Sequence, residues 1–213
     1  MTNIFNHITE EYDAWYDSEE GKPLYDSELH CVKSFIQDCL TPVLEVGVGT
    51  GRFAQWFPGA IGIDPALNAL RYARRRGVRV VQAAGEMLPF RNETFGCVFI
   101  LCTLCFVQNP FAVLKEIKRV LKRDGNSVIG FINSDSSWGA HYEEKKKQNH
   151  PIYSRARFYS REDVEKVVEQ SGLTISRVKS TLLQLPARPP VYEKSVDGFV
   201  EGAGFLCIEV RKS

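Results

Sequence analysis

The spacing of hydrophobic positions changes along the chain, and each spacing predicts one kind of element. Apolar residues recur every three or four positions over residues 27–40, which predicts a helix. From Val43 onward, short apolar runs alternate with stretches of helical spacing, which predicts strands separated by helices. The predicted strands cover residues 43–46, 60–63, 78–82, 95–102 and 127–133, and the predicted helices cover residues 52–57, 65–76 and 111–122.

The alternation stops after Asn133. Residues 134–159 are polar with several aromatic side chains, and a helix is predicted next over residues 161–171. Two late strands, at 173–185 and 204–210, flank a predicted loop over 187–197 that contains two consecutive prolines. Strands joined in this way can pair antiparallel at a sheet edge. The first 20 residues, rich in Tyr, Trp and Glu, predict a helix or a mobile arm.

Repeated strand–helix units predict an α/β fold with a doubly wound, mostly parallel sheet. The strands are continuous apolar runs, as expected for strands buried on both faces. A chain of 213 residues, 44% of them hydrophobic, can bury one sizeable core and suits a single domain. The sequence therefore predicts one domain built around one sheet.

A glycine-rich turn follows the first predicted strand. Gly47, Gly49 and Gly51 allow a tight turn and a close approach of the backbone to a ligand. Ligands of such sheets bind at the carboxyl ends of the strands. A dinucleotide motif would need a third glycine where Arg52 stands, so this residue disfavours a nicotinamide-dependent dehydrogenase.

An acidic residue, Asp64, ends the second predicted strand. A carboxylate at this place can accept hydrogen bonds from both hydroxyls of a ribose. Asp64 is followed by Pro65, a pair that also suits the start of a helix. Ribose binding and helix capping therefore remain two open interpretations of this residue.

Together with three later stretches, these motifs resemble class I S-adenosylmethionine-dependent methyltransferases. The stretches are residues 84–90, residues 93–95 and residues 114–125, so the resemblance covers residues 43–133. The chain is most similar to the small-molecule type, including enzymes that methylate quinone precursors in ubiquinone and menaquinone biosynthesis. It departs from the family at Ala84 and Gly96, where Asp is frequent. The resemblance implies a Rossmann-like, seven-stranded sheet with a C-terminal antiparallel hairpin.

The resemblance also implies S-adenosylmethionine as cofactor, S-adenosylhomocysteine as product and a set of binding residues. Glu45 is expected to hold the cofactor's ammonium group, although this buried carboxylate could instead pair with nearby backbone or an arginine. The other expected contacts are Gly47, Gly49 and Gly51 along the backbone, Asp64 and Pro65 at the ribose, Gly85, Glu86 and Met87 at the adenine, Cys102 and Thr103 at the methionine end, and Tyr12 and Trp15 in a covering arm. The arm's aromatic side chains could instead simply attach it to the core.

Three segments of this single domain are expected to have different tasks. Residues 1–40 would form an arm and helix that close over the cofactor as a lid. Residues 41–133 would form the S-adenosylmethionine-binding core, and residues 134–213 would add a substrate loop and the last strands. The general base, if the reaction needs one, is not assigned.

Cysteine and histidine residues predict no metal site. The six cysteines are expected to be buried free thiols in a reducing compartment. Cys102 and Cys105 have the spacing of a zinc half-site, but neither a second pair nor suitably spaced histidines accompany them. His141, His150 and Tyr153 could contact substrate, although surface positions are favoured.

Charge and hydropathy limit the partners. The chain has 27 Lys and Arg against 26 Asp and Glu, a balance that argues against a nucleic-acid partner. It lacks an apolar run of the roughly 20 residues needed to span a bilayer, so a soluble, cytoplasmic protein is predicted. The predicted activity is methyl transfer to a small molecule. A catalytically silent cofactor-binding subunit and an RNA methyltransferase are the alternatives, and monomer or homodimer is left open.

Overall fold

A computed structural model describes residues 4–186 and 189–213, so residues 1–3 of the predicted arm and 187–188 of the predicted loop lie outside it. The described residues form an eight-stranded sheet with the order β3-β2-β1-β4-β5-β8-β6-β7. Strands β1 to β5 pair in parallel, whereas β8, β6 and β7 join by antiparallel pairing. The strands are β1 (Val43–Val46), β2 (Ile61–Asp64), β3 (Arg79–Gln82), β4 (Phe95–Leu101), β5 (Leu121–Ile132), β6 (Leu173–Thr181), β7 (Val196–Asp197) and β8 (Phe205–Lys212).

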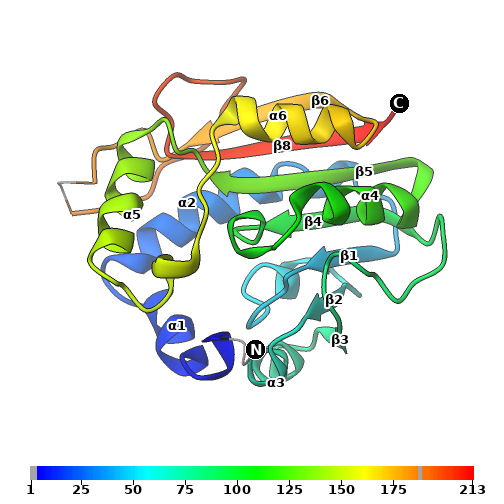
Figure 1. The fold of residues 1–213 in the computed structure, drawn as a ribbon, viewed down its shortest axis with the longest axis horizontal. Coiled ribbons are helices and arrows are strands. Elements are labelled where there is room, and N and C mark those ends of the chain that lie inside the picture. The colour runs from blue at the N-terminus through cyan, green and yellow to red at the C-terminus, as the bar shows by residue number, and fades with distance from the viewer. Residues whose placement is uncertain (1–3, 187–188) are drawn as a thin grey trace.

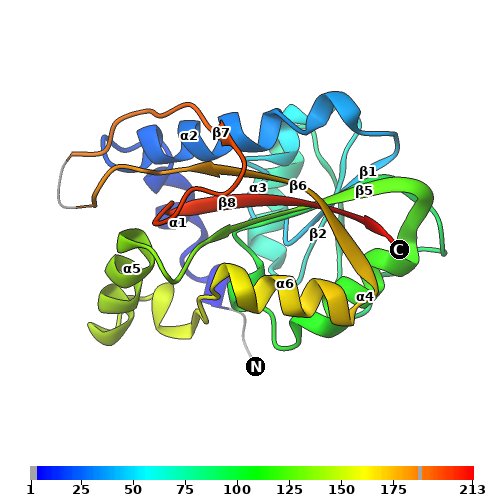
Figure 2. The same cartoon turned by 90° about the horizontal axis from the view of Figure 1, so that it is seen from above.

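Helices cover both faces of the sheet and one of its ends. Figure 2 shows α2 on one side of the strands and α4 and α6 on the other. Helices α1 and α5 lie at the end toward which the parallel strands run (Figure 1). The helices are α1 (Thr9–Trp15), α2 (Gly21–Lys33), α3 (Leu67–Arg75), α4 (Pro110–Val120), α5 (Ser137–Lys147) and α6 (Arg161–Gln170), with short 3-10 turns η1 (Ile4–Asn6), η2 (Ile36–Asp38), η3 (Ala54–Trp56), η4 (Leu104–Phe106) and η5 (Tyr153–Arg155).

The central strand β4 explains why its sequence is apolar at every position. Phe99 packs in a core beneath α2 and α3, and its neighbours Val98 and Ile100 pack in a second core beneath α4 and α6. All three side chains are fully buried. The predicted doubly wound α/β fold is therefore confirmed. The eighth strand, β7, was not predicted, because its two residues pair with β6 from within the predicted loop.

Two helices differ from their predictions. The helix predicted over residues 27–40 begins earlier, at Gly21, and ends at Lys33. The helix predicted over residues 52–57 is only the 3-10 turn η3. Phe57 precedes Pro58 and adopts an extended conformation with ψ 101°, because a following proline disfavours helical backbone.

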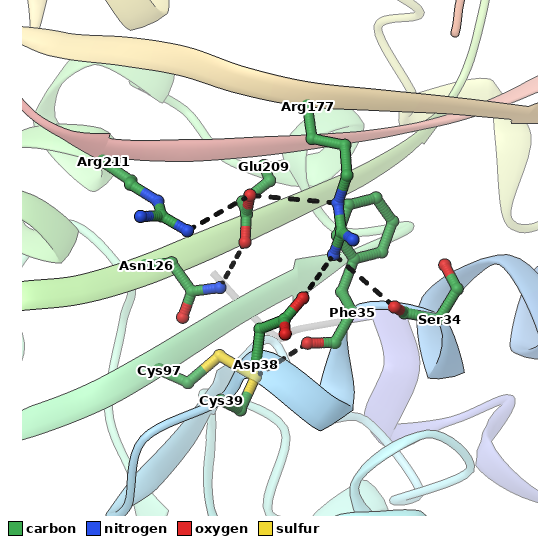
Figure 3. The surroundings of a disulfide bond; sticks show 9 residues. All are labelled: Ser34, Phe35, Asp38, Cys39, Cys97, Asn126, Arg177, Glu209 and Arg211. Carbon is green, nitrogen blue, oxygen red and sulfur yellow. Dashed lines mark hydrogen bonds and ion pairs between the residues drawn. A yellow bond between two sulfur atoms is a disulfide. The ribbon is translucent and has the colours of Figure 1, made fainter. Parts of the chain in front are cut away.

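A disulfide links Cys39, just after η2, to Cys97 on β4 (Figure 3). The prediction that all cysteines are free thiols is therefore wrong for this pair, which sequence spacing could not reveal because 58 residues separate its members. Arg177 of β6 reinforces the same junction. It pairs with Asp38 at 3.2 Å and lies 4.2 Å from the ring of Phe35. Cys31, Cys102, Cys105 and Cys207 are free.

The start of α6 supplies a stability prediction. Ser160 accepts a hydrogen bond from the Asp163 N–H at 3.0 Å, and Asp163 accepts one from the Ser160 N–H at 3.1 Å. Ser160→Ala removes the first bond and is expected to lower the free energy of unfolding by about 1 kcal/mol, whereas Ser160→Gly should cost only a few tenths. Urea denaturation measures both, and equal losses would contradict the capping argument.

Candidate functional site

The glycine turn after β1 has the backbone conformation that its sequence predicts. Gly47, Gly49 and Gly51 all have positive φ, at 74°, 51° and 82°. A side chain at Gly47 would collide with Thr103, which follows β4. Gly51 instead faces Ala73 of α3, so its task is to let that helix approach the turn.

A cavity of about 570 Å³ opens at the carboxyl ends of β1, β2 and β4, and we call it the cofactor cleft. This volume suits a small-molecule ligand. Three predicted contacts are not part of its lining: Gly51, Met87, which is 78% exposed, and Trp15, which lines a neighbouring cavity. The other predicted residues all line it: Tyr12, Glu45, Gly47, Gly49, Asp64, Pro65, Gly85, Glu86, Cys102 and Thr103.

Glu45 is a buried carboxylate whose hydrogen bonding is incomplete. The Ala54 N–H donates to it, so the predicted pairing with nearby backbone is present. Its Oε2 atom, however, has no hydrogen-bond partner within the described part of the chain. Burial raises the pKa of Glu45 well above its usual range. A buried oxygen without a partner is costly, and a cationic group in the cleft would satisfy it.

Asp64 shapes the rim of the cleft. Its two oxygens accept hydrogen bonds from the Gly49 N–H at 3.0 Å and the Ala66 N–H at 2.7 Å. It does not cap α3, which begins at Leu67 with Ala66 as its N-cap, so that interpretation is wrong. Burial raises the pKa of Asp64, although the two hydrogen bonds oppose this effect. Each oxygen keeps a free lone pair that can accept a ligand hydroxyl.

Glu86, in the loop after β3, connects two parts of the cleft lining through a hydrogen bond. Its Oε1 atom accepts a hydrogen bond from the Gln108 N–H at 3.1 Å. Phe106 lines the same cleft and packs edge-on against Phe5 at 5.1 Å between ring centroids. Neither Phe5 nor Phe106 was predicted. Phe106 lies beyond the strand predicted over residues 95–102, where no motif marks it, so the sequence carried no separate signal for it.

A second, smaller cavity of about 60 Å³ adjoins the cofactor cleft, and we call it the aromatic cavity. Cys102 and Thr103 line both, as do Tyr12, Tyr16 and Phe106. Among the residues that line only the aromatic cavity are Trp15, Glu28, Cys105, Tyr142, Tyr153 and Phe158.

The aromatic cavity revises one prediction for residues 134–159. Tyr153 was expected at the surface, but it lines this cavity. His141 and His150 do not line it. The ring centroid of His141 is instead 5.5 Å from that of Tyr142, and the ring centroid of His150 is 4.7 Å from that of Tyr153.

Helix α1 is joined to the glycine turn by arginine–aspartate pairs that the sequence did not reveal. Arg52 binds the Asp13 carboxylate through two hydrogen bonds of 2.9 and 3.0 Å and reaches Asp17 at 2.6 Å. Arg76 adds a bond of 2.8 Å to Asp13. Burial opposes ionisation of Asp13, but the arginines outweigh it and lower its pKa. Arg52 thus fastens α1 over the cleft.

Two further observations concern metal ions and membranes. Within residues 4–186 and 189–213, no group of three or more His, Cys, Asp or Glu side chains is placed to hold a metal ion. Over the same residues, none of the helices combines the length and apolar character that crossing a bilayer requires.

Comparisons with known proteins agree on one family. A family model described as a methyltransferase domain matches residues 44–129. An uncharacterized protein of Mycobacterium tuberculosis is 41% identical over 92% of this chain and 70% of its own length. One of Methanocaldococcus jannaschii is 38% identical over 99% of both chains. A Thermotoga maritima crystal structure described as an S-adenosylmethionine-dependent methyltransferase, possible histamine N-methyltransferase, has 34% identity and a TM-score of 0.88, covering 99% of this chain and 98% of that one.

Proposed function

The chain belongs to the S-adenosylmethionine-dependent methyltransferases, and from this premise we propose that it methylates a small molecule bound in the aromatic cavity. The observation that carries the proposal is the shared wall of the two cavities, made by Cys102 and Thr103 where β4 ends. Donor and acceptor must meet in line for methyl transfer. Cavities that share lining residues at the end of a central strand would bring donor and acceptor close together.

Residues of the cleft are assigned to the cofactor by their chemistry. We propose that Glu45 Oε2 receives the ammonium group, since this buried atom otherwise has no partner among the described residues. Asp64 would accept the ribose hydroxyls, and Gly85 with Glu86 would flank the adenine. When bound, S-adenosylmethionine supplies a methyl group activated by its sulfonium. The chain's own task is to orient the two reactants and exclude water.

The N-terminal arm is proposed to act as the lid. Tyr12 of α1 and Tyr16, just after its end, line both cavities, and their hydroxyls are hydrogen-bonded at 2.8 Å. Trp15 contributes to the aromatic cavity alone. Excluding water from both cavities would strengthen electrostatic interactions around the reacting atoms. Residues 134–159 would complete the acceptor side through Tyr142 and Tyr153.

The test has two stages. Calorimetric titration with S-adenosylmethionine and S-adenosylhomocysteine is expected to show saturable binding of both by the wild-type protein. Incubation with S-adenosylmethionine carrying a labelled methyl group and a cell extract of metabolites below 1 kDa should then label a small molecule, detected by mass spectrometry. Binding without any labelled product would favour the catalytically silent subunit. Labelling confined to a parallel incubation with total cellular RNA would favour the RNA methyltransferase.

A further inference from the structure

Glu28 is a buried carboxyl group in the aromatic cavity that the assignments above leave unused. It lies on α2 and is only 6% exposed. Its contact with the Cys102 Sγ atom is long, at 4.0 Å, and the described lining of the cavity contains no Lys, Arg or His. Burial raises the pKa of Glu28 to about 8. The cavity thus offers a carboxyl group without a cationic protein partner.

Aromatic side chains line the same cavity as this carboxyl group. Tyr142 packs against Tyr153 at 4.7 Å and against Phe158 at 6.0 Å between ring centroids, and Trp15 packs against Tyr16 at 5.3 Å. The faces of such rings attract cations, and the attraction grows when water is excluded. The aromatic side chains and Glu28 therefore favour a positively charged group.

Six other groups have their pKa raised by the charge of Glu28, and all of them are acids. They are Tyr12 and Tyr16 at α1, Cys102 in the loop after β4, Tyr142 of α5, Tyr153 of η5 and Cys207 of β8. Burial is the largest cause that raises the pKa of each, and the charge of Glu28 adds a smaller rise, so all six are uncharged near pH 7. Among Glu28 and these six groups, Glu28 is therefore the one whose ionisation changes near neutral pH.

We propose that the aromatic cavity takes a small amine as its ammonium ion and that Glu28 accepts the proton from the nitrogen. This inference rests on the proposed function. A cavity of about 60 Å³ has room for about four or five non-hydrogen atoms, since each needs roughly the space of one water-sized sphere. An ammonium ion can pair with the ionised form of Glu28, whereas neither an anionic acceptor nor a neutral alcohol would supply the countercharge that a buried carboxylate needs.

The proposed reaction balances in protons and electrons. The ammonium nitrogen gives one proton to the Glu28 carboxylate and gains a free electron pair. That pair forms the new bond to the methyl carbon while the carbon–sulfur bond breaks and its electrons remain on sulfur. One positive charge moves from sulfur to the methylated nitrogen, and Glu28 afterwards releases its proton to solvent.

Binding alone can test the charge preference. Calorimetry at pH 7, with protein saturated with S-adenosylhomocysteine, would compare propylammonium, 1-propanol and propionate, which are of similar size and differ in charge. Propylammonium should bind at least tenfold more tightly than the other two. Because Glu28 is mostly protonated at pH 7 and must ionise to pair, binding should also release close to one proton, measured in two buffers of different ionisation enthalpy.

Variants assign the effect to Glu28. Glu28→Gln should abolish the proton release, weaken propylammonium binding about tenfold or more and slow amine methylation by 100-fold or more. Asp26→Asn, on the same helix and in an exposed pair with Lys22, should change none of these. Glu28→Asp keeps a carboxyl group and should restore the proton release if the Gln variant does not fold.

The outcomes separate the two proposals. Equal binding of 1-propanol and propylammonium, or no propylammonium binding, would overturn the amine proposal while leaving the methyltransferase assignment intact. Proton release that persists in a folded Glu28→Gln variant would overturn the assignment to Glu28. Failure of wild-type protein to bind S-adenosylhomocysteine would instead count against the proposed function itself.

Discussion

Asp64→Ala is expected to weaken binding of S-adenosylhomocysteine about 100-fold or more. If both ribose hydroxyls donate to this carboxylate, the substitution removes two hydrogen bonds to a charged group, each worth about 1.5–3 kcal/mol. A loss of about 3 kcal/mol corresponds to roughly 100-fold in affinity. The Gly49 and Ala66 N–H groups also lose their acceptor, which loosens the turn that the ligand contacts. Calorimetric titration measures the change directly.

Asp64→Asn is the matched variant for this prediction. The amide keeps one acceptor oxygen and the side-chain shape, so its affinity should lie between those of wild type and Asp64→Ala. Thermal denaturation in the absence of ligand would show whether either variant is folded. Wild-type affinity in a folded Asp64→Ala protein would contradict the ribose assignment.

Asp13→Asn is expected to release the N-terminal arm and lower cofactor affinity about 10- to 100-fold. The side chains of Asp13 and Arg52 are each only 11% exposed, and removing one member of a buried ion pair costs about 3–5 kcal/mol. Much of this free energy should be lost from the docking of α1 onto the glycine turn, and little from the stability of the sheet. Faster proteolytic cleavage near α1 and altered Trp15 fluorescence, together with calorimetry, would show the release.

Asp17→Asn is the control, because the Asp17 side chain is 68% exposed and pairs with the same arginine. An exposed pair contributes at most about 1 kcal/mol, so this variant should bind cofactor nearly as wild type does. If Asp17→Asn and Asp13→Asn were equally impaired, the buried pair would not be what holds the arm.

The Asp13 pair also predicts a pH dependence. Its pKa is lowered in the folded protein, so its stabilising contribution is complete above the ordinary carboxyl value of 3.8. The contribution is lost as the pH falls through the lowered value. The resistance of the arm to proteolysis should therefore be constant across neutral pH and should fall only under acid conditions. Opening of the arm near pH 6 would contradict the role of the pair.

Much of the cofactor cleft could be predicted because its determinants are local. Gly47 and Gly49 have backbone angles that other residues rarely adopt, and they directly follow an apolar strand. Asp64 ends the next strand, so the parallel pairing of β1 and β2 brings it beside the glycine turn. Apolar runs without alternation likewise predicted a sheet covered on both faces.

Local patterns predicted less well where neighbouring residues compete with them. The helix predicted over residues 52–57 became one 3-10 turn because Pro58 acts on the residue before it. Strand β7 has too few residues to show periodicity, and pairing with β6 alone makes it a strand. Met87 directly follows Gly85 and Glu86, which line the cleft, yet its side chain points into solvent.

By itself, the sequence determined the α/β fold class and most of the cleft, since these depend on backbone angles and on the order of strands, and its resemblance to a known family indicated the cofactor. Tertiary structure alone decided which distant residues meet. It joined Cys39 to Cys97, brought Asp13 to Arg52 and placed Glu28 among the tyrosines of α1 and α5. A helix pattern shows that Glu28 lies near apolar neighbours, but only packing between elements determines whether that position faces solvent, a partner charge or a cavity.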